Sequence, residues 1–246
     1  MISWNPWHGC KKYSEGCLNC YVYRMDKMYG RDPSICNVTT MLDLPIRRNH
    51  KGEYKYPSGT KFFTCYTSDF FLEDADPIRP RVWEIIRERS DCYFMIITKR
   101  IDMMPYRLPP DWGMGYPNVE IMCTMENQRQ CDYRFPIFKQ IPIVHRSLCL
   151  EPLLGHIMFE PYLWGAGIER IVAGGESGYG ETIRPCNEEW VRRLHFQARQ
   201  NGIPFCFKQT GTKFIHLDSR MEIVARNAQF LRANQLGYQD FSIESL

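Results

Sequence analysis

Residues 91–100 have the sequence DCYFMIITKR, a short apolar run that ends directly in two cations. The run is continuously apolar and rich in β-branched and aromatic side chains, which is typical of a strand buried on both faces. Strands of this kind belong to parallel sheets that are covered by helices. The stretch therefore predicts an α/β fold, with charged residues just past the carboxyl end of a strand.

The same pattern recurs along the chain in both directions from this stretch. Helical patterns lie between several of the apolar runs, at 77–89, 128–140 and 187–201, and we expect the second of these to be broken by Pro136. Asn187 is expected to cap the third and Gly202 to end it. The expected strands are 1–3, 61–66, 91–98, 119–124, 142–150, 169–173 and 204–207.

The alternation of strand and helix predicts a parallel sheet with right-handed crossovers. About seven such units suit a TIM-type or partial (β/α) barrel with parallel strands better than an open sheet, which stays an alternative. We expect one barrel domain over 1–214, with a polar insertion at 31–59. The repeat stops after it, so 215–246 is expected to be a C-terminal extension.

The composition is compatible with several kinds of partner. The formal net charge of +3 over 246 residues permits a polyanionic partner but does not require one. No apolar run reaches the roughly 18 residues of a membrane span, so we expect no membrane contact. The first residues do not resemble a secretory signal, which predicts a cytoplasmic protein whose thiols stay reduced.

The eleven cysteines fall into two groups. Three of them, Cys10, Cys17 and Cys20, lie close together in WNPWHGCKKYSEGCLNCY, residues 4–21. Most of the others stand singly in apolar runs and are expected to be small buried hydrophobic side chains. Examples are Cys65, Cys123, Cys149 and Cys206.

Three clustered thiols are typical of a metal site. A closed zinc site needs four ligands, and His8 is the candidate for the fourth. A [4Fe–4S] cluster with three cysteine ligands instead leaves one iron open to a small molecule. Gly9 and Gly16 precede two of the cysteines and ease a tight wrap of backbone around a cluster. The pattern favours the open cluster, with the zinc site and structural thiols as alternatives.

Polar side chains follow six of the expected strands. Because the carboxyl ends of parallel strands meet at one edge of a sheet, where barrel enzymes place their catalytic groups, we expect these side chains to form a common site. They are Ser68, Asp69, Lys99, Arg100, Glu126, Asn127, Glu151, Glu176, Ser177, Lys208 and Gln209.

The motif at residues 4–21, together with YTSDFF, ITKR, SLCLEPLL, IVAGGESG and FKQTG, resembles the three-Cys-motif family of uncharacterised phage and bacterial proteins. The resemblance covers residues 1 to about 214. That family is distantly similar to radical S-adenosylmethionine enzymes, nearest to the spore photoproduct lyase branch. The resemblance implies a partial barrel with a [4Fe–4S] cluster in the loop after the first strand. It also implies S-adenosylmethionine chelating the open iron, an external electron donor, and a 5′-deoxyadenosyl radical that abstracts a hydrogen from the substrate.

The sequence departs from that superfamily at two places. Its cysteines are spaced C-x6-C-x2-C instead of the common C-x3-C-x2-C, and Asn19 stands where an aromatic residue usually precedes the last cysteine. The GGE tripeptide at 174–176 follows the sixth expected strand instead of the second. Ser68 and Asp69 stand at the second-strand position, so we expect them to contact the methionine amine, and Glu176 has no assigned role.

The remaining candidates divide by charge and shape. Lys99, Arg100 and Lys208 are expected to bind carboxylate or phosphate groups, with ion pairs within the site as the alternative. Aromatic residues of the cysteine segment either stack on an adenine or flipped base or shield the cluster. The expected cofactor-binding residues are Ser68, Asp69, Lys99, Glu126, Glu151 and Glu176, and the substrate-binding candidates are Arg100, Lys208, Gln209, Trp7 and Tyr21.

Together with this resemblance, these features predict a radical S-adenosylmethionine enzyme that uses a small-molecule cosubstrate and acts on a nucleotide or nucleic acid. Two alternatives stay open. One is a zinc-stabilised nucleic-acid-binding module, and the other is an iron–sulfur protein without catalytic activity.

Overall fold

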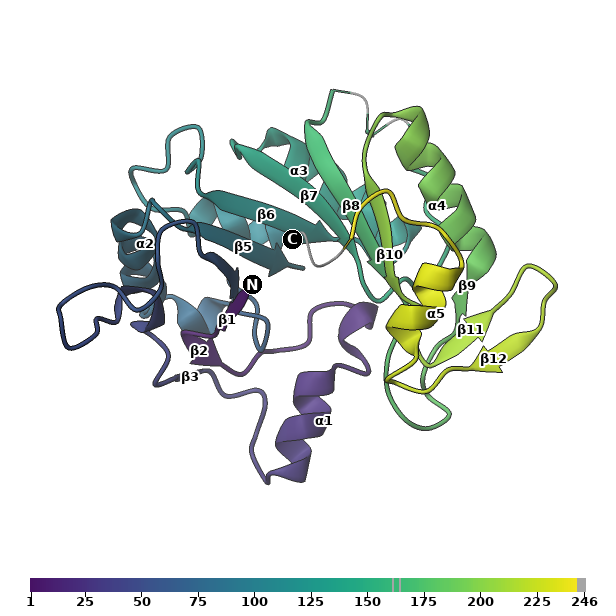
Figure 1. Ribbon diagram of the computed structural model, residues 1–246, viewed down its shortest axis with the longest axis horizontal. Helices are drawn as coiled ribbons and strands as arrows, with labels where there is room; N and C mark the ends of the chain where they lie inside the picture. Colours follow the sequence, from purple (N-terminus) through teal and green to yellow (C-terminus); the bar gives the residue numbers. More distant parts are fainter. Residues whose placement is uncertain (161, 164, 243–246) are drawn as a thin grey trace. The chain divides into compact units, whose positions relative to one another are not determined.

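A computed structural model of the chain describes residues 1–160, 162–163 and 165–242 (Figure 1). Its main sheet has seven strands in the order β1-β4-β5-β6-β7-β8-β10. All seven were expected from the sequence. They are β1 Ile2–Trp4, β4 Lys61–Thr64, β5 Tyr93–Thr98, β6 Val119–Thr124, β7 His145–Leu150, β8 Ile168–Gly174 and β10 Phe205–Gln209.

Parallel pairing relates the strands of this sheet. The pairs β1–β4, β4–β5, β7–β8 and β8–β10 are parallel, and the order begins at β1 and ends at β10. The α/β class with parallel strands is thus confirmed, and the strand order is that of a partial (β/α) barrel.

The chain forms two compact units. The first unit consists of Met1–Tyr13, Val22–Met122 and Gln140–His145, and the second of Ser14–Tyr21, Cys123–Lys139 and the chain from Arg146 onward. The boundary passes through the segment that carries Cys10, Cys17 and Cys20, with Cys10 in the first unit and Cys17 and Cys20 in the second.

The first unit is built around aromatic packing on β1, β4 and β5. The ring of Phe94 stacks on Phe62 at 5.2 Å and lies 5.5 Å from Trp4, and all three side chains are fully buried. Helix α2 spans Arg79–Glu88, within the expected helix at 77–89. β2 Trp7–His8 pairs antiparallel with β3 Asn37–Val38, and helix α1 Tyr21–Met28 begins directly after Cys20. Three 3₁₀ helices span Leu44–Ile46, Glu73–Ala75 and Ile101–Tyr106.

The second unit contains helix α4, Glu188–Gln200, whose expected cap is confirmed because the Asn187 side chain accepts a hydrogen bond of 2.9 Å from Glu189 N–H. A three-stranded sheet has the order β12 Met221–Ile223, β11 Lys213–Ile215, β9 Cys186–Asn187. Helix α5, Gln229–Gln235, packs against β10, and Phe207 N–H bonds Tyr238 O at 3.0 Å. Within the expected extension at 215–246, the described residues therefore include a strand and a helix, and the helix packs on the main sheet.

Helix α3 spans Gln128–Gln140 without interruption, so the expected break at Pro136 is wrong. A proline removes one backbone donor and crowds the carbonyl four residues earlier. Here both Pro136 and Asp132, four residues before it, are exposed. Water can therefore satisfy the carbonyl, while the buried face with Cys131, Phe135 and Phe138 keeps the helix in place. No helix in the described part of the chain is long and apolar enough to cross a bilayer.

Candidate functional site: the cysteine segment and its anchors

The eleven cysteines are all present as thiols, and their burial separates them into two groups. Cys10, Cys17, Cys20 and Cys36 are half-buried. The other seven are buried, which confirms the expectation for the single cysteines in apolar runs: Cys65, Cys92, Cys123, Cys131, Cys149, Cys186 and Cys206. All three thiols of the expected metal site therefore belong to the accessible group.

Cys10, in the first unit, is held by backbone and side-chain contacts. Its N–H donates to Pro33 O at 2.7 Å, and its carbonyl accepts from the Tyr23 hydroxyl at 2.6 Å. The Arg100 guanidinium donates to Cys10 Sγ at 3.6 Å and to Lys11 O. A guanidinium beside sulfur stabilises negative charge there, which suits a thiolate ligand.

Gly9 makes the close approach at Cys10 possible. Its φ is +99°, and a Cβ at this position would lie 2.0 Å from Ile35 O. Any side chain would be excluded by the backbone of residues 35–36, so only glycine fits here.

The residues after β4 and β5 organise the same region. Ser68 Oγ donates to Gly9 O at 2.6 Å and accepts from Trp7 Nε1 at 3.1 Å. The carboxylate of Asp69, 5% exposed, accepts from Thr98 Oγ1 at 2.8 Å and from the backbone N–H of Lys99 at 2.9 Å. Both residues thus fasten the loops that follow their strands.

The expected substrate contacts of the first unit differ in accessibility. The Trp7 ring is fully buried and lies 5.5 Å from the Phe70 ring, so it has no exposed face for a base. Arg100 is buried and directed at the cysteine segment, whereas the Lys99 side chain is half-buried. The tryptophan therefore contributes to the core.

In the second unit, residues 14–20 of the cysteine segment form tight turns. A 3₁₀ helix spans Glu15–Cys17, and Cys20 N–H donates to Cys17 O at 3.3 Å. This hydrogen bond places Cys17 and Cys20 at the two ends of one backbone turn. Tyr21, the other aromatic substrate candidate, is half-buried and begins α1.

Glu126, directly after β6, anchors the start of this turn. One carboxylate oxygen accepts from the Ser14 hydroxyl, and the other pairs with Arg134 of α3 at 2.6 Å. Both side chains of the ion pair are 0% exposed. A Cβ on Gly16 would lie 2.3 Å from Glu126 Oε1, so the glycine lets the turn lie directly on the carboxylate.

Asn127 anchors the next residue of the turn. Its amide donates to the Glu15 carboxylate, which also accepts from Gln130 at 3.3 Å. The hydrogen bond from Asn127, with a smaller one from Gln130, lowers the pKa of the Glu15 carboxyl.

Glu176, after β8, anchors the end of the turn. Its carboxylate accepts from Asn19 Nδ2 at 2.8 Å and from the Arg184 guanidinium and N–H. Burial alone would raise the pKa of Glu176, but the bonds from Arg184 and Asn19 outweigh it and hold the pKa below its ordinary value. Arg184 also donates to Glu15 O at 2.8 Å, so one arginine joins the anchor to the turn.

The glycines before Glu176 are explained by packing. A Cβ on Gly175 would lie 2.1 Å from Thr210 O, and Gly175 N–H donates to Gln209 O at 2.9 Å. The segments after β8 and β10 are therefore in direct backbone contact, with no side chain between them at Gly175.

A second polar group of this unit contains Glu151, Lys208, Gln209 and Ser177. Lys208 Nζ lies 3.0 Å from Glu151 Oε2, and the Gln209 amide donates to the same carboxylate. Ser177 Oγ bonds Gln209 Oε1 at 2.6 Å. The nearby Glu151 charge raises the pKa of Lys208, whose side chain is 42% exposed. The Lys208 and Glu151 side chains keep exposed surface, in contrast to buried Glu126 and Glu176.

Sequence reasoning found the strand-end residues but missed their partners. Glu126, Asn127 and Glu176 contact the cysteine segment, and the group around Glu151 forms its own network. The partners that the sequence did not indicate are Ser14, Asn19, Arg134 and Arg184. Ser14 and Asn19 lie inside the cysteine segment, so their polarity was a usable signal, whereas nothing local marks the two arginines.

Metal binding has indirect support only. Within the residues that are described, no three His, Cys, Asp or Glu side chains form a group arranged to hold a metal ion, so the cluster and zinc assignments both stay predictions. His8 has a defined orientation, because its Nε2 lies 2.7 Å from the carboxylate of Asp26, which is fully buried. This contact leaves His8 Nδ1 as the nitrogen for a ligand.

Comparison with known proteins places the chain in a family. A family model described as "Protein of unknown function (DUF5131)" matches residues 2–232. The chain belongs to this family. No curated protein and no solved structure matches it. The range matched to DUF5131 contains the whole cysteine segment and all of its anchors.

Proposed function

We propose that this DUF5131 member binds a [4Fe–4S] cluster through Cys10, Cys17 and Cys20 and cleaves S-adenosylmethionine reductively. The observation that carries the proposal is the fastening of residues 14–20 by Glu126, Asn127 and Glu176, which follow β6 and β8. Holding a short turn in one conformation costs conformational entropy. A ligand site justifies that cost, because its residues must be held in place before the ligand binds. A turn that only connects two elements would not need three separate anchors.

The residue types and spacing of the three cysteines support the proposal of a cluster. The three sulfurs lie within eleven consecutive residues, and all three are half-buried. A cluster held by three thiolates carries negative charge, and the Arg100 guanidinium beside Cys10 Sγ provides a compensating cation and a hydrogen bond to sulfur.

When bound and reduced by an external electron donor, the cluster would supply the one electron needed to cleave a C–S bond of S-adenosylmethionine into methionine and a 5′-deoxyadenosyl radical. The protein's own residues bind and position the cosubstrate. We assign Lys208 to an anionic group and Glu151 to ribose hydroxyls, because both side chains keep exposed surface. Ser68, Asp69, Glu126 and Glu176 act as positioning residues, since their polar atoms already fasten the protein.

The test is anaerobic purification with iron and sulfide analysis, followed by dithionite and S-adenosylmethionine. We expect bound iron and sulfide and formation of 5′-deoxyadenosine. Cys17→Ala should lose both, whereas Cys36→Ala, the matched control at a half-buried thiol outside the segment, should keep both. Cleavage that persists in Cys17→Ala contradicts the ligand assignment. Bound iron without cleavage indicates a non-catalytic cluster.

A zinc site is the second candidate, favoured by the His8–Asp26 contact. Histidines that bind zinc commonly donate their other ring N–H to a carboxylate, and Asp26 is placed for that role. His8 would then join the three cysteines as the fourth ligand. A colourless protein that contains zinc, and loses it in His8→Gln, would establish this site in place of the cluster.

A further inference from the structure

A basic hairpin, defined as residues 47–55 with the sequence RRNHKGEYK, stands out within the polar insertion of the first unit. It carries four cations, Arg47, Arg48, Lys51 and Lys55, and a single carboxylate, Glu53. Its net charge equals the formal +3 of the entire chain. The remaining residues are balanced, so the excess positive charge resides here.

The hairpin is ordered by its own backbone. Arg48 and Tyr54 form an antiparallel bridge, and Lys55 N–H donates to Arg47 O at 2.8 Å. At the tip, the Asn49 side chain accepts from Lys51 N–H at 2.9 Å, and Gly52 has a φ of +80°. The cations are therefore presented on a defined turn.

Contacts with the buried Arg89 side chain fix the base of the hairpin. The Tyr54 ring lies between the guanidinium groups of Arg48 and Arg89, each 4.1 Å from its centroid. Arg89, at the end of α2, is fully buried and donates to Tyr56 O at 2.8 Å. This packing joins the hairpin to the core of the first unit.

Carboxylates of the described residues do not neutralise these four cations. In the part of the chain that the structure describes, none of them pairs with a carboxylate. The Glu53 carboxylate instead accepts from Asn49 Nδ2 at 2.9 Å. Arginines elsewhere differ: Arg79 and Arg107, for example, both pair with Asp76. The charge of the hairpin is therefore available to a ligand.

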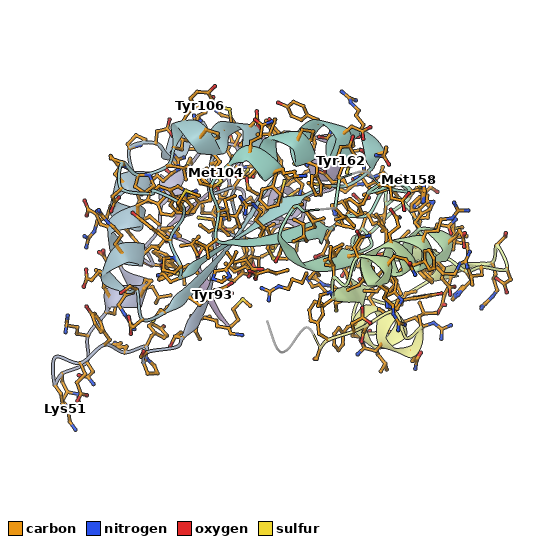
Figure 2. The ribbon with its side chains drawn as sticks, turned by 90° about the horizontal axis from the view of Figure 1, so that it is seen from above. Lys51, Tyr93, Met104, Tyr106, Met158 and Tyr162 are labelled. Atoms are coloured by element: carbon orange, nitrogen blue, oxygen red, sulfur yellow. The ribbon has the colours of Figure 1, made fainter. Side chains whose placement is uncertain are left out.

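The surface of the hairpin is polar as well as basic. All four cations are exposed, and Lys51 lies at the tip of a loop that extends into solvent (Figure 2). No large exposed hydrophobic side chain lies between Val38 and Tyr66. A membrane-binding loop would combine its cations with exposed apolar residues, so the chemistry favours phosphates on a hydrophilic polymer.

We propose that the basic hairpin binds the phosphodiester backbone of a nucleic acid. Cations on a protruding ordered turn are suited to backbone contacts, which position a protein without reading sequence. This inference rests on the charges of the hairpin and does not depend on the cluster or on S-adenosylmethionine.

The experiment measures binding of the full-length protein to a fluorescent duplex of about 20 base pairs between about 50 and 200 mM KCl, with single-stranded DNA and RNA of the same sequence alongside. Four phosphate contacts predict a slope of about −3 to −4 in log K against log [KCl]. In Lys51→Gln/Lys55→Gln we expect the slope to shrink by about 2 and affinity to fall about tenfold.

The control is Arg199→Gln/Arg226→Gln, which removes two exposed cations from the second unit. Its affinity should stay within about twofold of the parent, because these positions are outside the hairpin. Equal losses in the two double variants, absence of binding at low salt, or preference for phosphatidylserine vesicles over every nucleic acid would overturn the proposal. The hairpin variants should retain iron and cleavage, and Cys17→Ala should retain nucleic-acid binding, so the two proposals fail separately.

Discussion

Glu126 and Glu176 share a role at the scale of single residues. Each is buried, each is paired with an arginine, and each accepts a further hydrogen bond from residues 14–20. A buried carboxylate is costly unless paired, so these contacts depend on the ionised state. Protonation of the Glu176 carboxyl should therefore weaken the attachment of residues 14–20.

Glu176→Gln tests this dependence. Because the pKa of Glu176 is lowered in the folded protein, its stabilising contribution is complete above the ordinary value of 4.5 and is lost as the pH falls through the folded value. We expect the variant to be about 1.5–3 kcal/mol less stable than the parent at pH 7. Urea unfolding at several pH values should show this difference shrinking below pH 4.5.

Glu181→Gln is the matched control, since this carboxylate is exposed. It should differ from the parent by no more than about 0.5 kcal/mol at any of these pH values. A destabilisation of Glu176→Gln that stays constant down to about pH 3, well below the ordinary carboxyl pKa, would contradict an electrostatic anchor.

At the scale of elements, helix α3 and strand β6 are joined by one arginine. Arg134 Nη1 donates to Thr124 O at 2.6 Å and to Glu126 at 2.6 Å. The same carboxylate holds Ser14, so the position of α3 is linked to that of the cysteine segment. The uninterrupted course of α3 past Pro136 preserves this geometry.

Arg134→Met should destabilise the protein by about 3–5 kcal/mol, because it leaves the Glu126 charge buried without its partner. The double variant Arg134→Met/Glu126→Gln should recover part of the loss by removing that charge. Chemical denaturation measures both. Arg129→Met, at an exposed position of α3, should change stability by at most about 0.5 kcal/mol. A loss in Arg129→Met as large as that in Arg134→Met would contradict this explanation, because Arg134 is the residue that pairs with buried Glu126.

The strands were predictable and the anchors were not, for a physical reason. A buried strand can be recognised from consecutive residues, as an apolar run, and each of the seven runs forms a strand of the sheet. The polar residues after these runs were also recognisable. Their partners come from distant positions: Arg134 meets Glu126 because a helix turns back onto its strand, and Asn19 meets Glu176 across 157 residues of sequence. The cysteine ligands remain a prediction.

At the scale of the whole molecule, excess charge and accessible thiols are concentrated in different stretches of the sequence. The basic hairpin holds a charge equal to that of the chain, and the cysteine segment holds three of the four half-buried thiols. A ligand bound only by the folded chain raises the free energy of unfolding of the protein that binds it. Metal loading should therefore be visible in thermal unfolding.

The anaerobically loaded protein should unfold about 5–10 °C above the same protein after iron removal by a chelator, if the ligand is present at about 100 times its Kd. Differential scanning fluorimetry measures the shift. Cys36→Ala should show the same shift, and Cys17→Ala should show none. An unfolding temperature of the parent that is unchanged by the chelator would argue against a metal that is part of the folded state.

The backbone contact at Gly175 bears on how such chains can be found by pattern searching. The GGE tripeptide has two separable requirements: Gly175 is demanded by the carbonyl of Thr210, and Glu176 by Arg184 and Asn19. Neither requirement involves a cosubstrate. A search for this tripeptide after a strand would therefore select a way of closing two loops together, and a match would not by itself indicate a cosubstrate site.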